Sequence, residues 1–169
     1  MKNVQNTLQK KLYSDTLFTY IITAGFAIIS VIRFLNFLTN VDSVKIAGEN
    51  FKGTAPEILL SDSILYLFIA AALFLFSLIL SEIHKTGRPF SKKIINKLRT
   101  IAFVLIFASI IPNTVSSMVC DFLDADALSF SLSFETINLA IMVFGVVVGL
   151  FSEIFNYGFE LQENMDSIA

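Results

Sequence analysis

The chain has 169 residues, of which 55% are hydrophobic and 15% charged, and its formal net charge is −2. Soluble domains carry about 25% charged residues, so this composition excludes an ordinary soluble domain. The single cysteine, Cys120, excludes both an intrachain disulfide and a metal cluster built from cysteines.

Four long apolar stretches divide the chain. A helix needs roughly 20 apolar residues to cross a bilayer. The predicted spans are about 17–38, 63–83, 100–120 and 136–159. The sequence therefore predicts an all-α integral membrane protein, a four-transmembrane-helix bundle that forms one domain over residues 1–169.

The first span contains a charged residue, Arg33, about one turn from its far end. An arginine inside a membrane is costly and faces either a partner or the interface. Two interpretations stay open. The side chain reaches the interface, or it pairs with an outer acid such as Asp62, Asp121 or Glu135.

The segments at 39–62 and 121–135 are predicted to be the two outer loops. In the second, Leu128, Phe130, Leu132 and Phe134 alternate with serines. A period of two is typical of a strand with one apolar face. With a turn expected at 47–49, this predicts a small β-structure in the extracytoplasmic loops; the alternative is a segment that lies on lipid.

The segment 84–99 is a basic loop with clear helix-ending signals. Gly87 favours a helix C-cap, Pro89 blocks further helix, and Ser91 is a good N-cap. The helix that follows is amphipathic and begins with Lys92, Lys93, Lys97 and Arg99. These residues either anchor the protein to anionic lipid or dock an acidic partner.

Basic residues are distributed unequally between the two sides. Apart from Arg33, only Lys45 and Lys52 lie outside the N-terminus and the basic loop. Basic loops stay in the cytoplasm. The predicted location is the bacterial inner membrane, with four spans and both termini cytoplasmic.

The third span carries a polar stripe at helical spacing. Ser109, Asn113 and Ser116 recur every three or four residues. The stripe either packs on a neighbouring helix through hydrogen bonds, or forms an outward-facing polar site together with Arg33.

The fourth span contains Gly145 and Gly149, a spacing that lets two helix backbones approach closely. They pack within the bundle or form a homodimer through span four. From the end of this span onward, Glu153, Glu160 and Glu163 form an acidic stripe on a helix that continues past the membrane. Salt bridges from Glu153 or Glu160 to Lys92, Lys93 or Arg99 are the simplest expectation, although surface pairs of this kind contribute little.

The chain lacks the motifs that carry catalysis or cofactors. It has one histidine and no tryptophan, and no zinc, phosphate-loop or nucleophile motif is present. We therefore predict no enzyme activity, no cofactor and no metal, with membrane lipid as a partner and no direct contact with nucleic acid.

Two sequence segments and the four-span layout carry a family resemblance. The segments are Gly87 to Ser91 with Leu98 to Ala102, and the acidic helix end from Gly158 to Asp166. They resemble the bacterial membrane proteins grouped as domain of unknown function 2975, the YoaS-like family. The resemblance implies four membrane helices and no assigned activity. It also implies a gene that often neighbours one for a small helix-turn-helix protein.

Three functional hypotheses follow. The first is a membrane-bound regulatory partner that sequesters a small helix-turn-helix protein at the cytoplasmic face. The second is an immunity or envelope-stress protein that binds a peptide or lipid on the outer face. The third is a small transporter or channel, motivated by Arg33 and Asn113.

Overall fold

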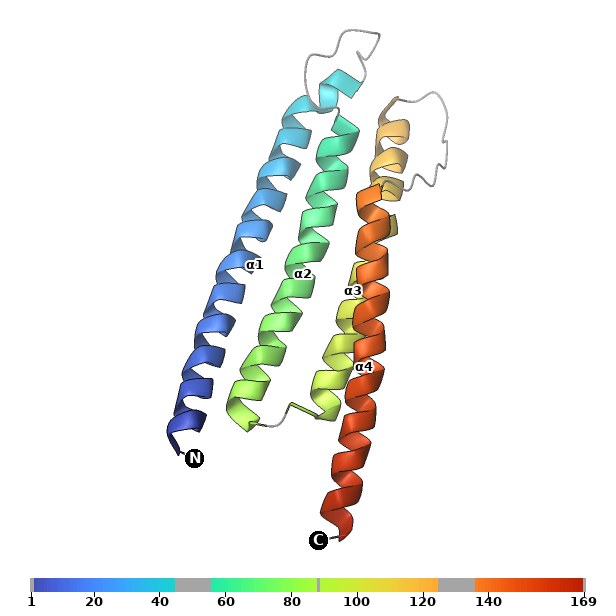
Figure 1. Cartoon of the computed structure of the whole chain (residues 1–169). Helices are drawn as coiled ribbons and strands as arrows, with labels where there is room; N and C mark the ends of the chain where they lie inside the picture. Colours follow the sequence, from blue (N-terminus) through green and yellow to red (C-terminus); the bar gives the residue numbers. More distant parts are fainter. Residues whose placement is uncertain (1, 45–55, 88, 125–135, 169) are drawn as a thin grey trace.

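A computed structural model describes residues 2–44, 56–87, 89–124 and 136–168. It contains four long helices: α1 (Lys2–Val44), α2 (Pro56–Thr86), α3 (Lys92–Asp124) and α4 (Thr136–Ile168). Both termini and the α2–α3 connection at 87–91 lie at the same end of the molecule (Figure 1). We call this the basic end, because the lysines at the start of α3 lie there.

All four helices are long and apolar enough to cross a membrane. Each continues beyond its predicted span, so the outer loops predicted at 39–62 and 121–135 are shorter than expected. Residues 39–44, 56–62 and 121–124 are helical. Most of the predicted β-structure, at 45–55 and 125–135, lies outside the described residues. No strand occurs among the described residues, and Ser43 and Val44, which come shortly before the predicted turn, belong to α1.

The helices pack in an open order rather than as a closed bundle. α1 packs on α2, α2 on α3, and α3 on α4, with a slight contact of α1 with α3. Across the described ranges, no Cα atom of α4 lies within 8 Å of a Cα atom of α1 or α2. The main apolar core lies between α2 and α3, around the buried residues Ala72, Ile79, Ile94, Ile101 and Leu105, and side chains of α4 such as Val148 and Phe155 pack against it.

Polar and aromatic contacts join α1 to α2. Ser30 Oγ donates to the Ser63 carbonyl oxygen at 2.8 Å, and Ser63 Oγ donates to the Ser30 carbonyl oxygen at 3.0 Å. Both serines are buried. The rings of Phe26 and Tyr66 lie 6.0 Å apart. In lipid, where apolar contact alone gives little drive to associate, such hydrogen bonds help to hold two helices together.

Close backbone approach joins α3 to α4. A Cβ atom added at Gly145 would lie 3.1 Å from the Ala102 carbonyl oxygen, the Ile106 Cγ1 and the Leu105 Cβ. At Gly149 the nearest atom would be the Ala102 Cβ, at 3.6 Å. The glycine face of α4 is therefore covered by α3, as the first of the two sequence interpretations expects. A homodimer through span four would have to use another face of α4.

The connection from α2 to α3 follows the predicted capping chemistry. Gly87 has a φ of 65°, and its N–H donates to the Ile83 carbonyl oxygen at 2.8 Å. Only glycine adopts this left-handed conformation without strain. Ser91 Oγ accepts from the Ile94 N–H at 3.4 Å, as an N-cap does. The two predicted helix ends are confirmed.

Candidate functional site

The basic side chains at the start of α3 are engaged by the chain itself. Arg99 Nη2 lies 2.9 Å from Glu153 Oε1, a pair that the sequence predicts. Lys93 Nζ lies 3.9 Å from Glu82 Oε1, and Lys97 Nζ donates to the Leu78 carbonyl oxygen at 3.4 Å. At the start of α3, Arg99, Lys93 and Lys97 thus each have a partner within the chain.

Phe90 and Lys92 dock the connection onto α4. The Phe90 ring lies 5.2 Å from the Phe155 ring, and a Cβ added at Gly158 would meet the Phe90 ring at 3.0 Å. Lys92 Nζ lies 5.5 Å from the centre of the Phe159 ring, within the range of a cation–π contact. The two segments that carry the family resemblance thus touch each other in the fold.

The acidic stripe of α4 divides into two parts. Glu153 pairs with Arg99, whereas Glu160 Oε1 accepts from Asn156 Nδ2 of the same helix at 3.0 Å. Glu160 and Glu163 are exposed. The end of α4 that carries them protrudes beyond the other helices at the basic end (Figure 1). Both carboxylates are therefore accessible on the part of α4 that extends past the other helices.

The predicted outer polar residues separate into an accessible pair and a packed group. Arg33 Nε lies 3.8 Å from Asp62 Oδ2, and both side chains are about a third exposed. The Asn113 side chain accepts a hydrogen bond from Ser61 of α2. Ser109 and Ser116 are fully buried and donate to backbone carbonyls of α3. The stripe of α3 therefore serves mainly in packing.

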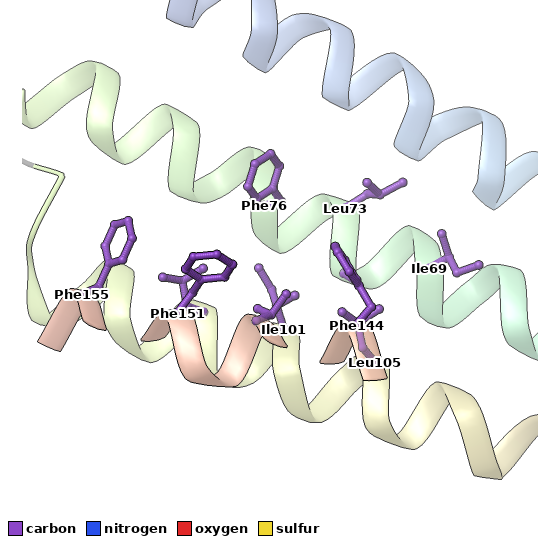
Figure 2. Close-up of a pocket in the computed structure, with 11 residues that line it drawn as sticks. Ile69, Leu73, Phe76, Ile101, Leu105, Phe144, Phe151 and Phe155 are labelled. Atoms are coloured by element: carbon purple, nitrogen blue, oxygen red, sulfur yellow. The ribbon is translucent and has the colours of Figure 1, made fainter. Parts of the chain in front are cut away.

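An apolar groove lies between α2 and α4, over α3 (Figure 2). Its volume is about 530 Å³. It exists because, in the described part of the chain, the backbone of α4 approaches that of α3 closely but stays farther from that of α2. Its lining residues are Ile69, Ala72, Leu73, Phe76, Leu98, Ile101, Leu105, Phe144, Val148, Phe151 and Phe155. The sequence does not predict the groove, because the apolar residues of a membrane helix show the same pattern whether they face lipid, another helix or a groove.

The structure offers little coordination chemistry. Within the described part of the chain, no group of three or more His, Cys, Asp or Glu side chains could hold a metal ion. His84 Nδ1 is buried without a hydrogen-bond partner there, and the His84 ring lies 6.2 Å from the Tyr13 ring. Cys120 is partly buried and packs beside Phe37, Leu59 and Leu60.

Comparison with known proteins gives one finding. The sequence model of a family described as "Protein of unknown function (DUF2975)" matches residues 5–168, nearly the whole chain. No curated protein and no solved structure matches significantly. The matched family is the one that the motifs around Gly87 and Gly158 resemble.

Proposed function

Because the chain belongs to the DUF2975 family, whose function is unknown, we propose its role from its own surfaces. We propose that it is a non-enzymatic, multi-pass protein of the bacterial inner membrane. Its protruding α4 binds a small helix-turn-helix transcription regulator at the cytoplasmic face and holds it away from DNA. The asymmetry of the basic residues supports this orientation, since Lys and Arg favour the cytoplasmic side.

The observation that carries the proposal is the acidic protrusion of α4. Glu160 and Glu163 are exposed there, while Arg99 and Lys93 are paired with acids of the chain. A helix-turn-helix protein contacts DNA phosphates through lysines and arginines. Carboxylates on a protruding helix offer the same basic surface an alternative partner, so binding here would compete with binding to DNA.

Affinity purification of the tagged protein from its native membrane tests this proposal. We expect a small helix-turn-helix protein in near-stoichiometric amount, lost from the double variant Glu160→Lys with Glu163→Lys. Glu57→Lys is the control, because it makes one such Glu-to-Lys exchange at an exposed position at the opposite end. The proposal would be contradicted if the double variant still recovered the partner, or if the parent protein recovered none.

The groove favours a second candidate function, binding of a lipid acyl chain. Its lining is wholly apolar, and it opens between helices that cross the membrane. This site differs from the outer-face site that the sequence suggests for a lipid. Filling it with Val148→Phe should reduce the phospholipid retained in native mass spectrometry. Leu67→Phe, at an exposed position outside the groove, should not; equal retention in all three proteins would contradict this candidate.

A further inference from the structure

The protruding end of α4 exposes an apolar stripe. Ile154, Tyr157, Leu161 and Met165 have exposed fractions of 62%, 64%, 47% and 71%. They follow one another at spacings of three or four residues, so they lie on one face of the helix. Single exposed apolar residues need no explanation, but a contiguous exposed stripe marks an interaction surface.

Much of this stripe lies beyond the membrane. A hydrocarbon core about 30 Å thick takes roughly 20 helical residues, whereas α4 has 33. The ion pair of Arg99 with Glu153 marks the start of the polar boundary at the basic end. Leu161 and Met165 follow Glu153 by two and more helical turns. Lipid tails therefore do not cover them.

The same stripe continues into the membrane. Val143, Val147 and Leu150 precede Ile154 at spacings of four, three and four, and all three are exposed. Together with Tyr157 and Leu161 they form an unbroken repeat of 3.5 residues. This period is the signature of a left-handed coiled coil. The face that α3 covers, with Gly145, lies on the other side of α4.

We propose that this stripe is the seam of a parallel homodimer, in which α4 of one copy packs on α4 of a second copy. An occupant that covers the whole stripe must cross the membrane beside α4 and leave it at the same end. It must also carry the same repeat for the same length. A second copy related by a two-fold axis along the membrane normal meets all three conditions, whereas a soluble helix reaches only the protruding part.

The charges beside the stripe agree with this arrangement. If Ile154 and Leu161 occupy the a positions, Glu153 and Glu160 fall at g. In a parallel pair each g residue faces an e residue of the partner, here Gly158 and Met165. The glutamates thus meet no like charge. Asn164 falls at d, where a polar side chain that meets its own copy would fix the register.

The dimer does not depend on the proposed regulator. The acidic stripe of Glu160 and Glu163 lies roughly a third of a turn or more from the seam, at about 100° per residue. Both surfaces can be occupied together. Purified protein reconstituted alone into bilayers therefore tests the dimer, and failure of the dimer would leave the regulator proposal to its own experiment.

Cysteine cross-linking in such bilayers is the experiment. Leu161→Cys should give a disulfide-linked dimer on mild oxidation, and Glu163→Cys should not, because it lies at the same depth off the seam. The parent protein, whose Cys120 lies at the opposite end, sets the background. Equal cross-linking of both variants would indicate random collision and overturn the proposal, as would no cross-linking above background.

A charged substitution gives a second readout that needs no cysteine. Leu161→Glu places a carboxylate in the seam, so the dimer fraction counted by single-molecule photobleaching should fall at least tenfold. Glu163→Gln should leave that fraction unchanged. An unchanged dimer fraction in Leu161→Glu would mean that copies associate elsewhere, and would overturn the assignment of this face.

Discussion

The two helix pairs of this molecule are held together by different chemistry. α1 and α2 are joined by the reciprocal hydrogen bonds of Ser30 and Ser63. α3 and α4 are joined by the close approach of Gly145 to the Ala102 backbone. In lipid both kinds of contact can hold two helices together. They differ in how they respond to a substitution. A seam of hydrogen bonds tolerates small changes of shape, whereas a seam of close-packed backbones does not.

The largest expected effect breaks the close-packed seam. Gly145→Leu would drive a side chain into the Ala102 carbonyl oxygen and the Leu105 Cβ, atoms fixed to the α3 backbone. Overpacking typically costs 1–3 kcal/mol, and we expect about 3 kcal/mol here because the backbone must move. The measurement is the midpoint of thermal aggregation in detergent, which should fall sharply.

Two other glycines serve as controls for that prediction. Gly149→Ala should be tolerated, because its new Cβ would lie 3.6 Å from the Ala102 Cβ, an ordinary contact distance. Gly25→Ala in α1 should raise stability by about 0.5–1 kcal/mol, since nothing lies within 4 Å and alanine favours the helix. If Gly145→Leu were as stable as these two, the close-packed seam would be refuted.

The second effect concerns the clamp that Phe90 places on the α3–α4 pair. Phe90→Ala removes the ring that covers Gly158 and contacts Phe155. A fully buried Phe→Ala change costs about 3–5 kcal/mol. Phe90 is only partly buried, so we expect about 2 kcal/mol. Chemical unfolding in mixed micelles, followed by circular dichroism, measures it.

A matched variant separates the clamp from general loss of apolar surface. Phe103→Ala likewise removes a phenyl ring, in this case one on α3. That ring is 61% exposed and faces away from the core. It should therefore cost well under 1 kcal/mol. Equal losses for Phe90→Ala and Phe103→Ala would mean that Phe90 does not clamp the pair.

The third effect tests the hydrogen-bonded seam. Replacing both Ser30 and Ser63 by alanine removes two interhelical hydrogen bonds while keeping the helices close. Such bonds average about 0.6 kcal/mol in membranes, so the double variant should lose about 1 kcal/mol. Thr23→Ala is the control, since its hydroxyl donates to the Thr19 carbonyl oxygen of the same helix. A loss above 3 kcal/mol would show that this seam is as intolerant of change as the close-packed one.

The four helices and their caps were predictable because each depends on local sequence. Apolar length alone predicts the spans, and Gly87 and Ser91 act within one turn of their own helix ends. The pairing of Arg99 with Glu153 was also foreseeable, since both must lie near the same boundary. These features need no knowledge of which helix lies beside which.

The open helix order and the groove were not predictable in the same way. Phe76 and Phe144 line the groove, while Phe107 is exposed elsewhere, and nothing in their local sequence separates them. In soluble proteins polar faces reveal which side is buried, but in lipid both sides are apolar. The sequence predicts that the fourth helix continues past the membrane, but hydrophobicity does not locate the residue at which that helix ends.

The smallest expected effect concerns the ion pair of Arg99 with Glu153. Its side chains are 45% and 62% exposed, and exposed pairs typically contribute about 0.2–1 kcal/mol. A double-mutant cycle with Arg99→Gln and Glu153→Gln should therefore give a coupling near 0.5 kcal/mol. The coupling should shrink further in 1 M salt, where the screening length is about 3 Å.

A coupling above 2 kcal/mol that resists salt would place the pair in a dry site, inside the hydrocarbon. The boundary would then lie farther along α4, and less of the Tyr157 to Met165 stripe would stand in water. The weak, salt-sensitive value is the one that agrees with a protruding seam.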